Sequence, residues 1–185
     1  MDLGVLGRHN TMNALAVAAT SWVMGIPGQK VTDGVKAFHG AGRRMEYKGE
    51  YRGAKVYDDY AHHPDELRAT LEAVRGMGDH RIVLAFQPHT YTRTKLLMDD
   101  FIRELQKADV VVLAEIYAAR ESNTIGISSA DLAAQIPGSI YCETLQDVTD
   151  CLRSIVREGD IVLTMGAGDI FRAGEALLSG EDSKK

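Results

Sequence analysis

The chain has 185 residues, of which 45% are hydrophobic and 25% charged, and its formal net charge at pH 7 is −5. This composition is typical of a globular protein with a sizeable core, and the acidic balance argues against a general nucleic-acid or anionic-membrane binder. No apolar run approaches the roughly 20 residues that cross a bilayer, and the N-terminus lacks the pattern of a signal peptide. We therefore expect a cytoplasmic protein.

The first 41 residues are predicted to be helices without a sheet beside them. Residues 10–24 form an Ala-rich predicted helix that Gly25 and Pro27 end, and residues 31–38 form a shorter one. Residues 40–42 look like a linker, and residues 45–57 look like a hairpin that turns at residues 48–50. Because two helices cannot build a core of their own, we interpret residues 1–41 as the last helices of a preceding domain that this chain lacks.

Strands and helices alternate from residue 55 to residue 178. The apolar segments 81–86, 110–114 and 161–165 are predicted strands, with shorter ones at 55–60 and near Ile140. The helical period predicts helices over residues 64–77, 93–108, 129–136, 145–157 and 170–178. This alternation predicts an α/β fold over residues 42–179, with a doubly wound, mainly parallel sheet and helices on both faces. Residues 180–185 are predicted to be a polar tail.

Metal and redox sites find little support in the residue spacings. Cys142 and Cys151 are the only cysteines and match no zinc motif, so we favour two reduced thiols over a disulfide. His62 and His63 are neighbours whose side chains diverge, and no third ligand stands at a motif spacing. We predict no metal site within this chain.

Ligands of open α/β sheets bind outside the carboxyl ends of the strands, which here selects residues 58–64, 87–94, 115–123 and 166–169. In the first of these stretches Asp58 and Asp59 point to opposite faces of a strand, so the two carboxylates cannot share one role. One of them can accept hydrogen bonds from a ribose. The alternative is a turn or N-cap residue ahead of the helix at Pro64.

The second stretch combines a strand end with basic residues. Pro88 stops the strand, and Thr92 or Thr94 can cap the following helix. With His89 and Arg93 beside it, this helix N-terminus is a prepared anion site. The alternative is a surface loop whose arginine lies in solvent.

The stretch Gly166-Ala167-Gly168-Asp169 is a poor dinucleotide fingerprint. Phe171 occupies the place of the third glycine, and the motif follows the last strand instead of the first, so we reject that interpretation. A close-approach turn capped by Asp169 remains. No Gly-x-x-x-x-Gly-Lys-Ser/Thr phosphate loop occurs, so the chain is not a complete P-loop ATPase.

One ordered set of motifs is specific. It comprises Gly7-Arg8-His9-Asn10-x-x-Asn13-Ala14, Asp59-Tyr60-Ala61-His62-His63-Pro64, Phe86-Gln87-Pro88-His89, Tyr91-x-Arg93-Thr94, Glu115-Ile116-Tyr117-x-Ala119 and Gly166-Ala167-Gly168. With this set the chain resembles, over nearly its whole length, the C-terminal part of the UDP-N-acetylmuramate–L-alanine ligases, a family of Mur ligases of peptidoglycan synthesis.

The resemblance implies a Rossmann-like C-terminal domain over residues 42–179, preceded by the last helices of a central ATPase domain over residues 1–41. It also implies a chemistry that needs ATP and Mg²⁺. ATP phosphorylates the carboxylate of UDP-N-acetylmuramate, and the amine of L-alanine attacks the resulting acyl phosphate. The phosphate loop and the Mg²⁺ ligands would lie in the missing domains, so we expect the chain alone to be inactive.

The resemblance further implies roles for individual residues. The nucleotide-binding set is His9, Asn10, Asn13, Arg43 near the phosphates and Asp59 at the ribose. The substrate-binding set is Tyr60, His62, His89, Tyr91 and Arg93, of which His62, His89 and Arg93 form the catalytic set. We prefer His62 as an orienting group over a general base. Thr90 stands where many members have arginine, which leaves one anion contact in doubt.

Three other interpretations stay open. A related Mur ligase attaches a recycled tripeptide to the same sugar nucleotide, but the loop from Thr90 to Arg93 favours the alanine enzyme. The chain could also be a non-catalytic nucleotide or amino-acid binding module, or a zinc hydrolase. Because the first helix is crowded with apolar residues, we also expect self-association of the chain.

Overall fold

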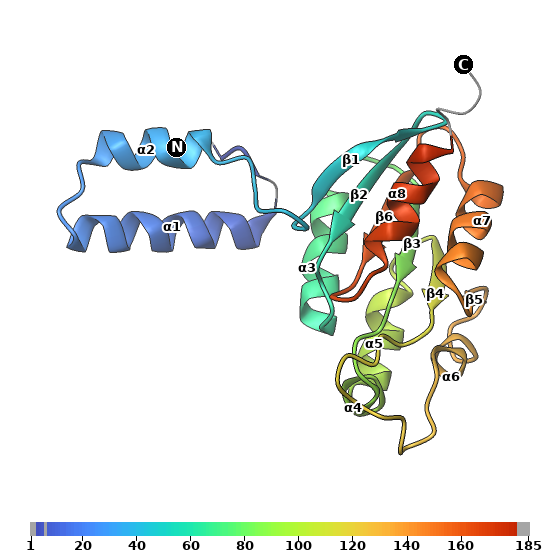
Figure 1. Cartoon of the computed structure of the whole chain (residues 1–185). Coiled ribbons are helices and arrows are strands. Elements are labelled where there is room, and N and C mark those ends of the chain that lie inside the picture. Colours follow the sequence, from blue (N-terminus) through green and yellow to red (C-terminus); the bar gives the residue numbers. More distant parts are fainter. Residues whose placement is uncertain (1–2, 6, 181–185) are drawn as a thin grey trace.

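The computed structural model describes residues 3–5 and 7–180, with the backbone alone for Arg8 and His9. Two antiparallel helices, α1 (Arg8–Val23) and α2 (Gly28–Ala37), form an arm that stands away from the rest of the molecule (Figure 1). Gly25, with φ +70°, allows the turn between them. Among the described side chains of α1 only Ala14 and Ser21 are buried, and α2 buries none.

A six-stranded sheet forms the centre of the molecule, in the order β1-β2-β6-β3-β4-β5. The strands are β1 (Glu46–Tyr51), β2 (Ala54–Asp59), β3 (Ile82–Phe86), β4 (Val110–Ala114), β5 (Ile140–Cys142) and β6 (Ile161–Met165). Only β1 runs antiparallel to its neighbour, and every other pair is parallel. Strand β6 therefore lies between β2 and β3, which places the last strand beside the first parallel one.

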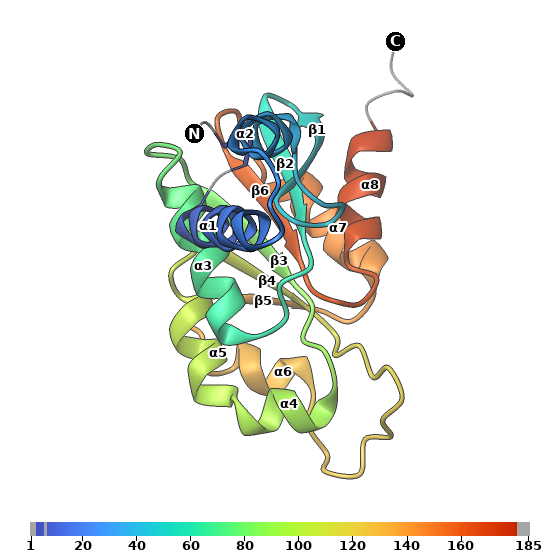
Figure 2. The ribbon, with the colours of Figure 1, turned by 90° about the vertical axis from the view of Figure 1, so that its left-hand side faces the viewer.

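Helices cover both faces of the sheet. On one face α3 (Pro64–Arg75), α5 (Met98–Leu105) and α6 (Ser129–Ala133) pack on a core that includes Leu67, Phe86 and Phe101. On the other, α7 (Leu145–Ile155) and α8 (Phe171–Ser179) pack on a core that includes Val83 and Leu152. Figure 2 shows α3 and α5 on one side and α7 and α8 on the other. The predicted doubly wound α/β fold is confirmed.

The predicted hairpin is present, but its turn lies three residues later. Strands β1 and β2 are joined at Arg52 and Gly53, whose φ angles of +50° and +78° suit a two-residue turn of the primed type. Gly49 instead lies inside β1, where the register shifts between Tyr47 and Gly49 in a bulge. The glycine predicted to turn the chain bends the strand.

The helix predicted over residues 93–108 is two helices, α4 (Tyr91–Leu96) and α5. Leu97 separates them with φ −109° and ψ 22°, outside helical geometry. The break lets α5 bury Phe101 and Leu105, whereas Leu96 remains 82% exposed. The N-cap of α4 is Thr90, so the prediction that Thr92 or Thr94 caps this helix is wrong.

The N-cap of α3 is His63, whose ring nitrogen accepts a hydrogen bond from the Asp65 N–H. Of the turn and the N-cap that were the alternatives for the aspartates ahead of this helix, Asp59 forms the turn, because its carboxylate accepts the Ala61 N–H. One further capping prediction, that of Asp169, is wrong. The N-cap of α8 is Ile170, because the Asp169 carboxylate accepts a hydrogen bond from the distant Gln87 amide. Most of the predicted polar tail, residues 181–185, lies outside the described residues. Within residues 3–5 and 7–180, no helix has the length and apolar character to cross a bilayer.

Candidate functional site

The carboxyl ends of four strands bring the four predicted stretches to one edge of the sheet. The Gly166 N–H donates to the Asp59 carbonyl, which joins the ends of β6 and β2. The Gln87 N–H donates to the Met165 carbonyl, which joins β3 to β6. His89 and Tyr117 form a parallel bridge between the loops that follow β3 and β4. The candidate site is thus built on rigid strand ends.

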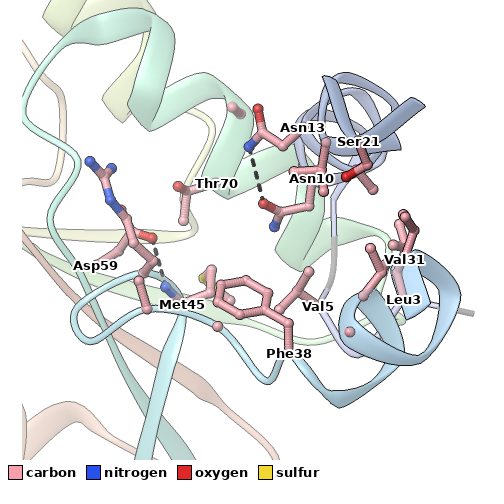
Figure 3. A pocket seen from close by; sticks show the side chains of 18 of the residues that line it. Leu3, Val5, Asn10, Asn13, Ser21, Val31, Phe38, Met45, Asp59 and Thr70 are labelled. Carbon is pink, nitrogen blue, oxygen red and sulfur yellow. Dashed lines mark hydrogen bonds between the residues drawn. The ribbon is translucent and has the colours of Figure 1, made fainter. Parts of the chain in front are cut away.

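A cavity of about 960 Å³ lies between the arm, the linker and α3. We call it the arm cavity. Its walls are largely apolar, with Val5, Val31 and Phe38 from the arm side, and its polar lining includes Asn10, Asn13, Arg44, Asp59 and Thr70. Figure 3 shows Asn10 and Asn13 on one side of this space and Asp59 on the other. The side-chain amide of Asn13 donates a hydrogen bond to the side-chain oxygen of Asn10 at 3.5 Å.

Asp59 lines the arm cavity at the end of β2 and is only 4% exposed. One of its carboxylate oxygens accepts the Met45 N–H at 2.9 Å (Figure 3), and the other accepts the Ala61 N–H at 2.8 Å. Burial raises the pKa of Asp59, against the effect of these two donors. The carboxylate is therefore fixed in place, and each oxygen keeps a lone pair for a further donor.

Asp58 faces the opposite side of the strand, as the alternation of a strand requires. Its carboxylate accepts hydrogen bonds from Arg43 Nε at 2.8 Å and from the Thr164 hydroxyl at 2.7 Å. The other two guanidinium nitrogens of Arg43 donate to the Gly166 and Gly168 carbonyls. All three nitrogens of Arg43 thus have partners within the chain, so its contact with nucleotide phosphates stays a prediction.

Arg44 is a candidate residue that sequence reasoning missed. It lines the arm cavity, and its guanidinium lies over the Tyr60 ring at 5.6 Å. Arg43 instead lies between Tyr60 at 5.0 Å and Phe171 at 4.6 Å. Two adjacent arginines look alike in sequence, and only the fold decides which one faces the cavity.

A second group of predicted residues lies beside the arm cavity, and we call Tyr60, His62, His89 and Arg93 the histidine cluster. The Tyr60 and His62 rings meet edge to face at 5.5 Å, and the His62 and His89 rings lie 5.8 Å apart. His62 Nδ1 contacts the Tyr60 carbonyl at 3.0 Å. Because Asp59 and Tyr60 are consecutive, the two sites share the end of β2.

Two nitrogen atoms of the histidine cluster lack a partner. His89 Nδ1 and Arg93 Nη1 are buried and make no hydrogen bond within the described chain. Burial lowers the pKa of His89, and the nearby Arg93 and His62 lower it further. Since unpaired buried polar atoms are costly, this arrangement suits an anionic ligand that accepts from Arg93 Nη1 and, in the tautomer with the proton on Nδ1, from His89.

The remaining predicted residues are placed less informatively. Tyr91 is a half-buried residue at the start of α4, and the side chain of His9 lies outside the described residues. Thr90 has φ +67°, which is unusual for a β-branched residue. Cys142 and Cys151 are free thiols. Among the described residues, no three His, Cys, Asp or Glu side chains converge as a metal site.

Comparisons with known proteins agree with this geometry. Residues 43–168 match the family described as Mur ligase, glutamate ligase domain. The chain is 47% identical over 182 residues to a UDP-N-acetylmuramate–L-alanine ligase of Lachnospira eligens, a match that spans 96% of this chain and 40% of the relative. The chain thus spans about 40% of the length of the curated relatives it matches.

Solved structures show the same likeness. A UDP-N-acetylmuramate–alanine ligase of Thermotoga maritima superposes with a TM-score of 0.83 at 29% identity, covering 99% of this chain and 40% of that one. A folylpolyglutamate synthase of Mycobacterium tuberculosis, solved with ADP and AMPPCP, shares the fold with a TM-score of 0.68 at 20% identity, covering 96% and 41%. The family match covers more than half of the chain, and the chain therefore belongs to the Mur ligase family, whose glutamate ligase domain it carries.

Proposed function

We propose that this chain is the C-terminal part of a cytoplasmic, ATP-dependent ligase that joins L-alanine to UDP-N-acetylmuramate in peptidoglycan synthesis. The observation that carries the proposal is the pair of buried, unpaired donors His89 Nδ1 and Arg93 Nη1 next to the arm cavity. A carboxylate of a small amino acid has the charge and size to accept from both donors. The names of the curated relatives support L-alanine as that amino acid.

The arm cavity is the proposed nucleotide site. Its apolar walls suit an adenine ring, and Asn10 and Asn13 supply amide groups that can read its edge. The fixed carboxylate of Asp59 is placed to accept ribose hydroxyls. His9 joins this set as a proposal from the family motif. Arg43 and Arg44 would stand near the phosphates, while the Mg²⁺ ligands and the phosphate loop belong to the parts of the enzyme beyond this chain.

The role of these residues would be positioning and charge stabilisation. An acyl phosphate is already activated, so the protein needs to hold the amine of L-alanine against the carbonyl carbon, and such orientation contributes up to about 7–11 kcal/mol. Arg93 and His89 would hold the carboxylate, while Tyr60, His62 and Tyr91 would shape the space around it. Because His62 Nδ1 is engaged with the Tyr60 carbonyl, we favour an orienting role for His62.

The sharpest test compares two neighbouring basic residues in the complete ligase. Arg93→Ala should lower kcat/KM for L-alanine at saturating ATP by roughly 10- to 150-fold, because a charged hydrogen-bonded anchor contributes about 1.5–3 kcal/mol. Lys95→Ala is the matched control, since Lys95 is exposed on the same helix. Equal losses in both variants, or a fully active Arg93→Ala enzyme, would remove Arg93 from the site.

The chain alone should bind ATP no tighter than about millimolar, roughly −4 kcal/mol, because the proposed site lacks the phosphate loop and the Mg²⁺ ligands. It should form no UDP-N-acetylmuramoyl-L-alanine. Both expectations are checked by calorimetric titration and by a product assay on the purified chain. Measurable ligation by the 185 residues would overturn the partial-enzyme interpretation.

Self-association of the chain is a separate proposal that rests on the arm. Trp22 and Val23 are each 85% exposed, and Met12 and Leu15 are more than half exposed. Apolar surface of this extent tends to be covered by another chain. Sedimentation of the chain over a concentration series should show association that weakens when residues 1–40 are deleted. An unchanged oligomeric state after deletion would argue against the arm as the contact surface.

A further inference from the structure

The loop that follows β4, residues 115–128, is hydrogen-bonded to the segment that contains His89 and leads into α4 with Arg93. The Tyr117 N–H donates to the Pro88 carbonyl at 2.8 Å, and the Thr90 N–H donates to the Tyr117 carbonyl at 2.9 Å. The Tyr117 ring stacks on His89 with centroids 5.7 Å apart and an interplanar angle of 21°. Residues 115–123 of this loop follow a strand end, where ligands are predicted to bind, yet the proposed reaction assigns them no role.

Glu121 makes the most specific of these contacts. One oxygen of its carboxylate accepts the Thr92 N–H at 2.9 Å, and the other accepts the Thr92 hydroxyl. These donors hold the pKa of Glu121 below its ordinary value, so the carboxylate is charged at neutral pH. Helix α4 has no side-chain cap from its own N-cap residue Thr90. Glu121 therefore supplies, from a different loop, the cap that the first turn of α4 lacks.

The backbone beside this contact is in an unfavourable conformation. Thr90 has φ +67° and ψ 143°, a region that β-branched residues rarely adopt. The Thr94 hydroxyl and the Thr94 N–H both donate to the Thr90 carbonyl, at 2.7 and 3.2 Å. Such a conformation persists only where neighbouring contacts hold it. Thr90 lies between His89 and Arg93, so its conformation sets the angle between their side chains.

A negative charge beside an anion site needs an explanation, because a carboxylate repels the anion that the site is meant to hold. Both oxygens of Glu121 are occupied by Thr92. We propose that Glu121 is a positioning residue, which fixes the first turn of α4 so that Arg93 and His89 face one ligand, without touching that ligand itself. This inference rests on the proposed carboxylate site.

The test uses the chain itself, labelled with ¹⁵N, and two probes that share a carboxylate. L-alanine and propionate are titrated separately while the side-chain signals of His89 and Arg93 are followed by NMR. Glu121→Ala should weaken the binding of both probes by the same factor, about tenfold. The hydrogen bonds that this variant loses involve a charged carboxylate and hold the first turn of α4, and neither probe takes part in them. The Thr92 amide should exchange with solvent about tenfold faster or more.

Two variants serve as controls. Glu121→Gln retains an oxygen that can accept from Thr92 and should recover part of the lost affinity. Glu143→Ala removes the same charge from an exposed residue that follows β5, and should leave both titrations and the Thr92 exchange unchanged. If Glu143→Ala weakened the probes as much as Glu121→Ala does, the loss would not depend on the contact with Thr92, and the positioning role would be refuted.

The outcomes separate this inference from the function on which it rests. A loss for L-alanine with none for propionate would mean that Glu121 contacts the amine, which contradicts a positioning role. Equal binding of both probes by wild type and Glu121→Ala would refute the role of Glu121 and leave the carboxylate site intact. A wild-type chain whose His89 and Arg93 signals respond to neither probe would refute the carboxylate site, and the proposed role of Glu121 with it.

Discussion

Gly168 lies so close to its neighbours that Gly168→Ala should destabilise the turn after β6. A Cβ at this position would lie 2.6 Å from Tyr117 Cγ and closer still to Gln87 Oε1. The Gln87 side chain cannot simply move aside. Its oxygen accepts the N–H groups of Asp169 and Ile170, at 2.9 and 3.1 Å, and its nitrogen donates to the Asp169 carboxylate.

The expected loss of stability comes from the two N–H groups that lose their acceptor when the Gln87 amide is displaced. Ile170 is fully buried and Gln87 is 5% exposed, so water does not readily replace the lost acceptor. Two backbone N–H groups without a partner, at about 1–3 kcal/mol each, suggest a loss of about 2–6 kcal/mol. For a chain of this size about 3 kcal/mol corresponds to a fall in Tm of roughly 6–12 °C.

Urea unfolding measures this loss directly, as a lower midpoint with an unchanged m-value. Gly28→Ala is the matched control, because nothing lies within 4 Å of the added methyl group and the site is the first residue of a helix. That variant should be neutral or more stable by up to about 1 kcal/mol. If Gly168→Ala unfolds within about 0.5 kcal/mol of the wild type, the amide of Gln87 does not hold this turn.

The remaining predictions concern the buried ion pair, the site histidine and the arm. Arg43→Met should lower the free energy of unfolding by about 3–5 kcal/mol, because it strands the buried charge of Asp58; a loss below about 1 kcal/mol in urea unfolding would contradict this. The pKa of His89 is below the ordinary 6.5 in the folded chain, so on acidification the unfolded state takes up this proton first. The folded state is therefore favoured fully above about pH 7, and this part of its stability is lost as the pH falls through the folded pKa. Thermal unfolding from pH 5 to 8 should show a shallower slope for His89→Gln, and an identical slope would exclude His89 as the source. Amides of the described part of α1 should exchange faster than those of β3 and β4, because α1 buries few side chains; slower exchange in α1 by mass spectrometry would mean that another chain covers it.

Helices and strands whose buried residues form a regular pattern along the chain could be predicted well. Strands β3 and β4 are uninterrupted apolar runs, and Thr164 alone interrupts β6, because both faces of these strands are covered by helices. Helix α3 is indicated by Pro64 in its first turn and by Leu67 and Leu71 at helical spacing. In each case the signal and the structure come from the same few residues.

The two capping predictions failed at residues whose side chains bind distant partners. The cap expected from Asp169 is absent because Gln87, 82 residues earlier, takes its carboxylate. Thr92 is not a cap because α4 begins at Tyr91, and its hydroxyl and N–H both bind Glu121, 29 residues later. Local capping rules compare neighbours along the chain, and they cannot weigh a partner that the fold brings from elsewhere.

By itself the sequence determined the α/β alternation, the edge of the sheet at which the candidate site lies and the family whose motifs it carries. Residue type and period carry that information, since each element buries its own apolar face. Only the tertiary structure decided that β6 lies between β2 and β3, that Arg43 turns inward while Arg44 lines the arm cavity, and that Glu121 meets Thr92. These contacts join loops up to 125 residues apart, and the order of the strands in the sheet sets which loops meet.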